Sequence, residues 1–329
     1  MKGNKNKTSN KYIKIMLLTL LVIASILSVY LVTKTNNKVF NAKIINQKAD
    51  TREVVNIPDQ DLKNFLLTYL KKPDDERGYS YYAYLKLSNT SYIKPANETE
   101  IYKDEMEKIT EIRARNINTK ETAMDLTGIE KAINLTSLDL YSNKIENIEP
   151  LKGLTNLTDL VLSYNKIEDV EPLRGLTNLT DLVLSYNKIE DVEPLRGLTN
   201  LTSLSLYNNK IENIEPLKGL TNLTSLPLSW NKIENVEPLK GLTNLTSLPL
   251  SWNKIENVEP LKGLTSLKNL NLLENKIENV EPLKGLTSLT YLMLDYNKIE
   301  NVEPLKGLTN LTNLSLSSNK IENVEPLKG

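Results

Sequence analysis

The sequence predicts an α/β solenoid, with a parallel β-sheet on its concave face and short helical turns on its convex face. Three observations support this fold class. From Asn134 to the C-terminus, one pattern recurs with a step of 22 residues. Each copy contains an L-x-L pair, and this period of two is typical of a short strand with one buried face. Each copy also ends in E-P-L-[KR]-G, where proline suits the first position of a helical turn.

One asparagine marks each of the nine repeats, at the point where the chain must turn inward after the strand. An amide side chain can donate and accept hydrogen bonds at once, so it can satisfy backbone groups that the turn exposes. Stacked repeats are expected to align these side chains as a structural ladder, formed by Asn143, Asn165, Asn187, Asn209, Asn231, Asn253, Asn275, Asn297 and Asn319. Gly175 and its equivalents are expected to permit the turn back to the next strand.

A single repeat cannot bury its own leucines, and an open solenoid end exposes both leucines and unpaired strand edges. We therefore expect residues 133–329 to form nine stacked repeats and residues 54–132 to form a helical cap with an atypical first repeat. In that first repeat, Ile112 and Ala114 lie four residues too early for the 22-residue step, and Ile117 stands where asparagine is expected. The predicted cap helix presents one apolar face, formed by Leu62, Phe65, Leu66 and Leu70.

The repeat resembles the leucine-rich repeat family. Its form L-x-x-L-x-L-x-x-N-x-I-x-x-I is similar to that of the internalin subclass of bacterial surface proteins. The segments "VNIPDQDLKNFLLTYLKK" and "YKDEMEKITEI" resemble the helical N-terminal cap of internalins. The resemblance implies a horseshoe that grips a protein partner on its concave face, without implying which partner.

The segment at 74–100 departs from the family pattern, because the family cap has a shorter connection there. Tyrosines crowd this insert. Two interpretations remain open: a hairpin packed on the cap, or an exposed aromatic patch that adds binding surface.

The N-terminus has the pattern of an export signal. A basic leader at 1–14 precedes an uncharged run at 15–33, which is close to the roughly 20 residues that span a bilayer as a helix. Cleavage remains open, but the run lacks the small-residue site of a secretory signal, so an uncleaved membrane anchor followed by a linker at 34–53 is favoured. The remainder is then extracytoplasmic, either anchored or secreted. Because the sequence stops at "IENVEPLKG" without a cap, we expect a truncated gene or a short variant.

Composition excludes several function classes. The chain has no cysteine and no histidine, which excludes thiolate metal sites, cysteine nucleophiles and histidine acid–base catalysis. Its 41 basic and 41 acidic residues give no attraction toward nucleic acid. The columns of Glu and Lys are uniform along the repeats, so they distinguish no catalytic pair of carboxylates. We expect a protein that is not an enzyme and that needs no cofactor or metal.

The positions that vary between repeats are where a binding surface is expected. Aromatic residues recur just before the ladder asparagine, and others lie nearby on the strands. Tyr and Trp dominate protein interfaces, so this strip is a candidate for partner binding, although rings that merely cover the turns are the alternative. The candidate residues on the concave face are Tyr141, Tyr164, Tyr186, Tyr207, Trp230, Trp252, Tyr291, Met293 and Tyr296.

The stretch "SLPLSWNKIENVEPLKG" occurs twice and places the prolines Pro227 and Pro249 in predicted strands. Each proline should remove one ladder hydrogen bond, worth about 1 kcal/mol, and create a soft spot in the sheet. Trp230 and Trp252 are expected to stand side by side there, at the centre of the binding surface.

Three functions are compatible with these observations. The favoured one is an exported adhesin that binds another protein, either a host receptor or an envelope protein, while the N-terminal helix attaches it to the membrane. The second is a structural spacer without a dedicated ligand. The third is a binding subunit like the regulators of some phosphatases, against which the apolar leader argues.

Overall fold

The computed structural model describes residues 34, 52–78 and 80–328. The chain divides into two compact units, Met1–Glu53 and Val54–Gly329, and the description that follows concerns the second. The predicted membrane segment at 15–33 lies outside the described residues. Among the residues that are described, no helix is both long enough and apolar enough to cross a bilayer.

The elements of the second unit begin with α2 (Gln60–Leu70), the short 3₁₀ helix η1 (Asp74–Glu76), strand β1 (Ala83–Leu87), helix α3 (Lys103–Met106) and strand β2 (Ile109–Ala114). Helix α2 begins after Asp59, whose carboxylate accepts the amides of Asp61 and Leu62 at 3.0 Å each. Its apolar face, Leu62, Phe65, Leu66 and Leu70, is buried.

The repeats contribute one short strand each, with a single exception described below. These strands are β3 (Ser137–Asp139), β4 (Asp159–Val161), β5 (Asp181–Val183), β6 (Ser203–Ser205), β7 (Ser247–Pro249), β8 (Asn269–Asn271), β9 (Tyr291–Met293) and β10 (Asn313–Ser315). Neighbouring repeat strands pair in parallel, with leucine beside leucine, as Leu160 is beside Leu182. Strand β1 pairs antiparallel with β2 at the start of the sheet.

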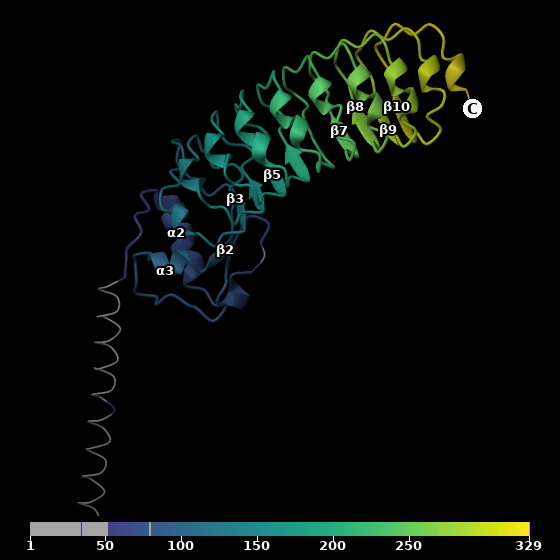
Figure 1. The fold of residues 1–329 in the computed structure, drawn as a ribbon. Helices are drawn as coiled ribbons and strands as arrows, with labels where there is room; N and C mark the ends of the chain where they lie inside the picture. The colour runs from purple at the N-terminus through teal and green to yellow at the C-terminus, as the bar shows by residue number, and fades with distance from the viewer. Residues whose placement is uncertain (1–33, 35–51, 79, 329) are drawn as a thin grey trace, which may run out of the picture. The chain divides into compact units, whose positions relative to one another are not determined.

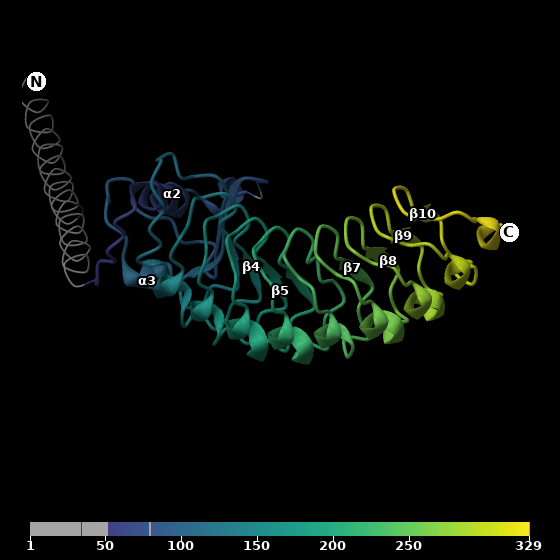
Figure 2. The same cartoon turned by 90° about the horizontal axis from the view of Figure 1, so that it is seen from above.

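A 3₁₀ helix follows in each repeat, and most begin at Glu-Pro-Leu. They are η2 (Ile129–Lys131), η3 (Glu149–Leu151), η4 (Glu171–Leu173), η5 (Glu193–Gly197), η6 (Glu215–Gly219), η7 (Glu237–Leu239), η8 (Glu259–Gly263), η9 (Glu281–Gly285), η10 (Glu303–Leu305) and η11 (Glu325–Leu327). Within this unit the strands follow one long side of the curve (Figure 1), and the short helices follow its convex side (Figure 2). The predicted solenoid of parallel strands and short helical turns is confirmed.

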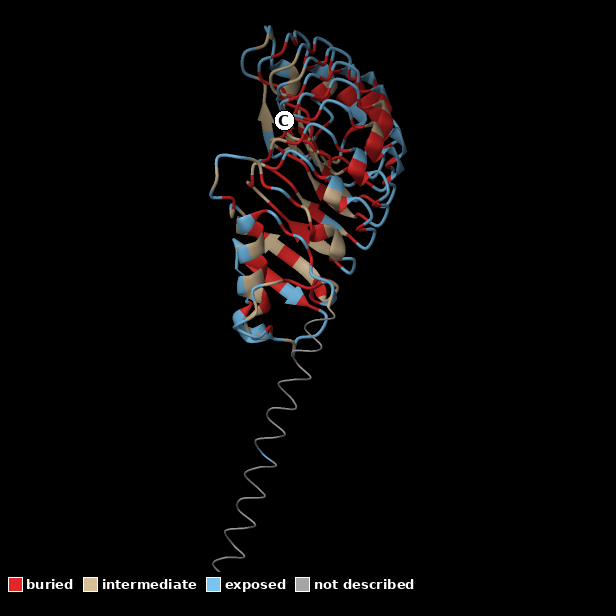
Figure 3. Ribbon diagram, turned by 90° about the vertical axis from the view of Figure 1, so that its left-hand side faces the viewer, coloured by how far each residue is buried: buried red, intermediate tan, exposed pale blue. Residues whose placement is uncertain are grey.

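One continuous apolar core runs between the strands and the 3₁₀ helices. In most repeats the leucines and isoleucines of the pattern have almost no exposed surface, as for Leu160, Leu162 and Ile167. Figure 3 shows these buried positions enclosed by exposed loops. Because each fully buried Leu or Ile contributes roughly 1.5–3 kcal/mol, stacking of repeats is the main source of stability.

The first repeat has a longer step in sequence than the others, but its strand still occupies the next place in the sheet. Ile112 of β2 pairs with Leu138 of β3, a step of 26 residues, and the core therefore continues without a gap into β2. Asparagine is displaced as well: Asn118, one residue after the expected position, is buried and donates to the carbonyl of Asn143 at 2.8 Å. The sequence pattern missed this residue because it was sought at Ile117.

Gly128 lies where the chain before α2 meets the first repeat. Its φ is +100°, and an added Cβ would lie 2.6 Å from the Ile57 side chain and 2.8 Å from the Asn56 carbonyl. Gly175, in contrast, has an ordinary negative φ and open space around it. Glycine is compatible with the turn at Gly175 but is not required there by the backbone, whereas the equivalent Gly153 has a φ of +93°.

The Tyr-rich insert does not fold into a hairpin of its own. Instead its strand β1 adds to the sheet beside β2. Tyr84 of β1 is buried, whereas Tyr81 and Tyr82 just before it are exposed and contact each other edge to face. One part of the insert thus packs on the cap, and another part exposes aromatic side chains.

The sheet is interrupted at the first of the two proline repeats. It divides into one part from β1 to β6 and another from β7 to β10, joined only by isolated bridges at Ser225. The interruption falls where Pro227 stands, because proline has no amide to donate to the neighbouring strand. Pro249 still lies in β7, since that strand pairs with β8 on its other side.

Candidate functional site

The ladder asparagines form hydrogen bonds that fix the turns carrying the aromatic strip. Asn165 is typical: its side-chain nitrogen donates to the carbonyls of Leu140 and Leu162 at 3.1 and 2.9 Å. Its side-chain oxygen accepts the backbone amides of Asn143 and Ile145 at 3.0 and 2.9 Å, and the bond from the isoleucine amide recurs in the later repeats. Each asparagine thereby links its own repeat to the preceding one, and holds the turn after the strand in a fixed conformation.

The residue before each ladder asparagine has a left-handed backbone. Its φ lies between 53° and 59° at Ser142, Tyr164, Tyr186, Asn208, Trp230, Trp252, Glu274, Tyr296 and Ser318. For a residue other than glycine or asparagine this conformation costs roughly 1–2 kcal/mol. Five of these nine residues are Tyr or Trp, which the backbone does not favour there. Their presence indicates that these side chains have a role that offsets the cost of the strained backbone or depends on that backbone.

Four tyrosines form one continuous series of rings, which we call the tyrosine series. Tyr164 and Tyr186 are stacked, with centroids 4.0 Å apart and planes inclined by 20°. Tyr141 contacts Tyr164 at 5.0 Å, and Tyr207 contacts Tyr186 at 5.1 Å. Hydrogen bonding to Tyr186 raises the pKa of Tyr164 to about 12, and the same bond lowers the pKa of Tyr186. The protonation of Tyr164 and that of Tyr186 are therefore linked.

Arg115 connects the tyrosine series to the Tyr-rich insert, because it contacts a tyrosine of each. The Arg115 guanidinium lies 4.5 Å from the centroid of Tyr81 and 5.8 Å from that of Tyr141. Asp139, which is buried, holds Arg115 in this place by an ion pair of 2.7 Å. An arginine is thus sandwiched between two tyrosines and fixed by a carboxylate.

Trp230 and Trp252 form a second, separate stack. Their ring centroids lie 4.4 Å apart with planes inclined by 19°, and the two side chains keep 44% and 41% of their surface exposed. Between the tyrosine series and this pair stands Asn208, which has no ring. The structure therefore brings the candidate residues together in two groups.

The remaining candidate residues belong to neither stack. Tyr296 is 56% exposed and is separated from Trp252 by the repeat that carries Glu274. Tyr291 and Met293 lie on β9 itself and are partly exposed. Aromatic side chains are thus frequent on the N-terminal and central repeats and less frequent beyond Glu274.

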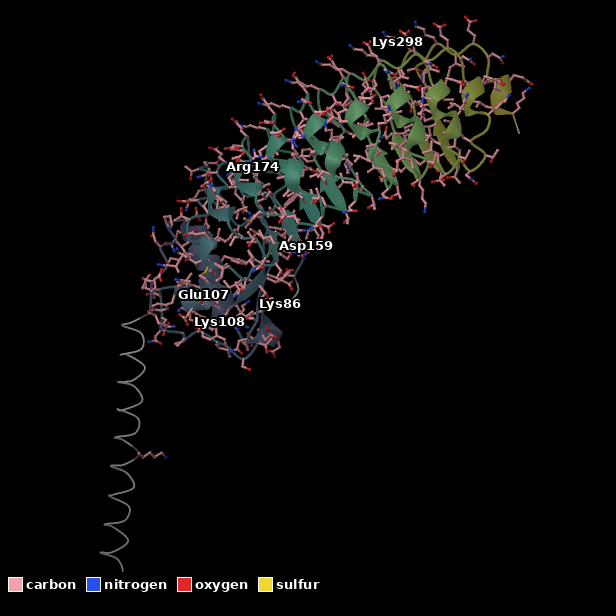
Figure 4. All side chains as sticks on the ribbon, in the orientation of Figure 1. Lys86, Glu107, Lys108, Asp159, Arg174 and Lys298 are labelled. Carbon is pink, nitrogen blue, oxygen red and sulfur yellow. The ribbon has the colours of Figure 1, made fainter. Side chains whose placement is uncertain are left out.

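The charged residues of the repeats form ion pairs that neutralise one another. Lys188 pairs with Glu168 of the preceding repeat at 3.1 Å, and Arg174 pairs with Glu171 of its own 3₁₀ turn at 2.6 Å. Such exposed pairs contribute about 0–1 kcal/mol each. In Figure 4, Arg174 and Lys298 mark these loops, whereas Asp159 marks strand β4. Within the described residues, no group of His, Cys, Asp or Glu is arranged to hold a metal ion.

A second asparagine ladder, which sequence reasoning missed, lies on the exposed side. Asn178 donates to the carbonyl of Thr155 in the preceding repeat at 2.8 Å, and Asn200 donates likewise to Thr177 at 2.9 Å. The Asn-Leu-Thr triplets that contain these residues resemble glycosylation sequons, which concealed their structural use. Ser266 and Ser288 replace the asparagine in two later repeats, so this ladder is discontinuous.

Comparison with protein families identifies leucine-rich repeats in this chain. A model described as two copies of leucine-rich repeats matches residues 133–175, 177–219 and 287–329, and a single-repeat model matches 219–236 and 241–258. A search of curated proteins found no match.

Solved structures provide closer parallels. Internalin C2 of Listeria monocytogenes is 30% identical over 79% of this chain and 94% of its own, with a TM-score of 0.56. Internalin F of the same organism is 28% identical over 85% of this chain and 95% of its own, with a TM-score of 0.50. The ectodomain of the Arabidopsis thaliana receptor kinase GASSHO1/SCHENGEN3, solved in complex with CASPARIAN STRIP INTEGRITY FACTOR 2, is 28% identical over 61% of this chain and 26% of its own, with a TM-score of 0.55.

Proposed function

Since this chain belongs to the internalin-type family of leucine-rich repeat proteins, we propose that it is an exported, non-enzymatic module that binds a protein partner through its aromatic strip. The family supports the protein-binding part of this proposal, because leucine-rich repeats of this kind serve as interaction scaffolds. The similarity to a plant receptor ectodomain solved with a bound factor supports it further.

The observation that carries the proposal is the strained and exposed position of the aromatic residues. Trp230 and Trp252 have left-handed backbones that disfavour Trp, yet both side chains lie outside the core and remain partly exposed. Large, stiff, partly exposed rings on a rigid frame are what protein interfaces use as anchors. Burial of these rings against a partner would offset the cost of placing them there.

The location of the protein follows from the N-terminal sequence. The basic leader at 1–14 and the uncharged run at 15–33 support export, with the run serving as an anchor and the repeats outside the cytoplasm. In this setting the partner is a host receptor or another envelope protein. The family resemblance to Listeria internalins is compatible with either.

A structural spacer is the second candidate, and one observation favours it. The rings of Tyr164 and Tyr186, and those of the two tryptophans, contact each other across repeats, so they stiffen the solenoid even without a ligand. The two functions make opposite predictions for a variant that lacks the tryptophans. A phosphatase-regulator-like subunit is a third possibility in principle, but no feature of the described repeats favours it.

Capture of surface proteins by the immobilised chain tests the proposal. The variant Trp230→Ala/Trp252→Ala should lose a partner that the unaltered chain retains. The matched control is Lys240→Ala/Lys262→Ala, which alters one exposed residue directly after η7 and one within η8, in the same two repeats. Equal capture by all three proteins, each shown to be folded by circular dichroism, would exclude the aromatic strip as the binding surface.

A further inference from the structure

We infer that Trp252, Glu274 and Tyr296 form a receptor for one cationic side chain, an arginine guanidinium, of the protein partner. The inference rests on the proposed function and specifies one contact within it. It follows from the interruption of the aromatic column by a single carboxylate, and from the way the chain fills a similar arrangement elsewhere with its own arginine.

The three residues occupy equivalent positions in consecutive repeats. Their φ values are 56°, 55° and 54°, and each precedes a ladder asparagine, so their side chains leave the backbone at the same point of the turn. Strands of a sheet lie about 4.8 Å apart, which places Trp252 and Tyr296 about 9.6 Å from each other along the column. Glu274 stands midway between them.

Trp252 keeps 41% of its surface exposed beside this gap. Its other face is covered by Trp230, and the close stacking of the two rings shows that their planes stand across the direction of the column. The opposite face of the Trp252 ring is therefore directed along the column, toward the repeat of Glu274. Tyr296 at the far end is more than half exposed, and across the described residues its ring contacts no other aromatic ring.

Glu274 provides the charge. Its side chain is partly buried in the column, and among the residues that the structure describes no Lys or Arg nitrogen lies within 4 Å of its carboxylate. The neighbouring glutamates differ from it: Glu256 is paired with Lys276, and Glu278 is paired with Lys298. A carboxylate between aromatic residues without a cation attracts a positively charged group from outside.

The chain itself contains the filled counterpart of this site. Arg115 lies between Tyr81 and Tyr141, at 4.5 and 5.8 Å from their centroids, with Asp139 as its carboxylate. A guanidinium centred between Trp252 and Tyr296 would lie at similar distances from both rings. Guanidinium is favoured over ammonium because it is planar, stacks on aromatic faces and forms two parallel hydrogen bonds with a carboxylate.

The test uses the full chain with Trp230→Phe, which keeps the stack and leaves Trp252 as the sole fluorophore of the two tryptophans. The probe is N-acetyl-arginine amide, and N-acetyl-citrulline amide is the neutral probe of the same shape. The arginine probe should change Trp252 fluorescence in a saturable way at millimolar concentration and low salt, and citrulline should not. Added salt should weaken the effect.

Further substitutions in the Trp230→Phe protein test whether the arginine probe binds at the inferred site. Glu274→Gln and Tyr296→Ala should each weaken binding of the arginine probe by about fivefold or more, whereas Glu256→Gln should leave it unchanged. Equal responses to arginine and citrulline, or an unaltered affinity in Glu274→Gln, would overturn the inference. Because no partner protein is involved, such a failure would leave the capture experiment with Trp230→Ala/Trp252→Ala to decide the proposed function separately.

Discussion

The backbone amide of Leu206 donates to the carbonyl of Pro227 at 2.9 Å, but Pro227 has no amide with which to complete the ladder. In a parallel pair the bonds alternate in direction, so the missing donor would have bonded to the carbonyl of Leu204. Pro249 leaves the same deficit one repeat later, where Leu228 donates to its carbonyl at 2.8 Å. Two successive junctions of the sheet thus lack a hydrogen bond.

Hydrogen exchange should detect this deficit. The amides of Leu206 and Leu228 should exchange about fivefold faster than those of Leu162 and Leu184, because one hydrogen bond is worth about 1 kcal/mol in local opening. Restoring a donor with Pro227→Ser, the residue type found at Ser205, should slow exchange at Leu206 and raise the free energy of unfolding. Uniform protection across the repeats would show that the neighbouring repeats fully compensate.

The cost of the left-handed backbone can be measured at two tyrosines. Tyr296→Asn should raise the free energy of unfolding by about 1 kcal/mol, because asparagine tolerates this conformation and Tyr296 has no stacking partner to lose. Tyr186→Asn should not raise it, since the same relief is offset by the loss of ring contacts with Tyr164 and Tyr207. Denaturant unfolding of both variants provides the comparison, and equal stabilisation would mean that stacking contributes nothing.

The coupled phenols predict a pH dependence above neutrality. Tyr164 has a pKa of about 12 against its ordinary value of 10, chiefly because of its hydrogen bond with Tyr186. The folded state therefore retains a proton that the unfolded state releases, and this contribution to stability is lost as the pH rises from about 10 to 12. Tyr186, with a lowered pKa, makes a contribution of the opposite sign just below pH 10.

Removal of one hydroxyl tests this coupling. Tyr186→Phe keeps a stacked ring but removes the oxygen, so the pKa of Tyr164 should fall back toward 10, as followed by ¹³C NMR of labelled tyrosine. The control Tyr291→Phe alters a tyrosine outside the series and should leave that pKa unchanged. A Tyr164 that still titrates near 12 in Tyr186→Phe would refute the assignment of the shift to this bond.

Alanine variants at three glycines distinguish the effect of backbone strain on stability from the effect of steric contact. Gly128→Ala should lower the free energy of unfolding by several kcal/mol, because its Cβ would meet the backbone of Asn56 as well as Ile57. Gly153→Ala has a positive φ but open space, and should cost only the strain, about 1–2 kcal/mol. Gly175→Ala has neither and should be neutral or slightly stabilising. Thermal unfolding of the three variants should therefore rank them in this order.

The repeat region was predictable because its physical constraints are periodic. Leucines at fixed spacing must be buried by stacking, and this determines strands, turns and register from β3 onward. The parts that escaped prediction are those where periodicity fails. Asn118 was missed because the first repeat has a longer step, and β1 was not expected to join the sheet because the insert has no counterpart in the repeat.

The sequence indicates which aromatic residues recur beside the turns, but not how their rings are grouped. Sequence places aromatic residues in one column, but whether rings stack depends on side-chain torsions and on the residue between them. Asn208 separates the tyrosine series from the tryptophan pair, and Glu274 separates that pair from Tyr296. The contact of Arg115 with Tyr81 joins segments that are distant in sequence and share no pattern.

The two asparagine ladders should differ greatly in their importance for stability. Asn187→Ala would leave the buried carbonyls of Leu162 and Leu184 and the amide of Ile167 without their partner, at a cost of roughly 2–4 kcal/mol. Asn178→Ala removes one exposed bond to Thr155, where water can substitute, and should cost less than about 1 kcal/mol. Urea unfolding with unchanged m-values would measure both. If the two variants lost equal stability, the inner ladder could not be the principal polar support of the turns on which the aromatic column stands.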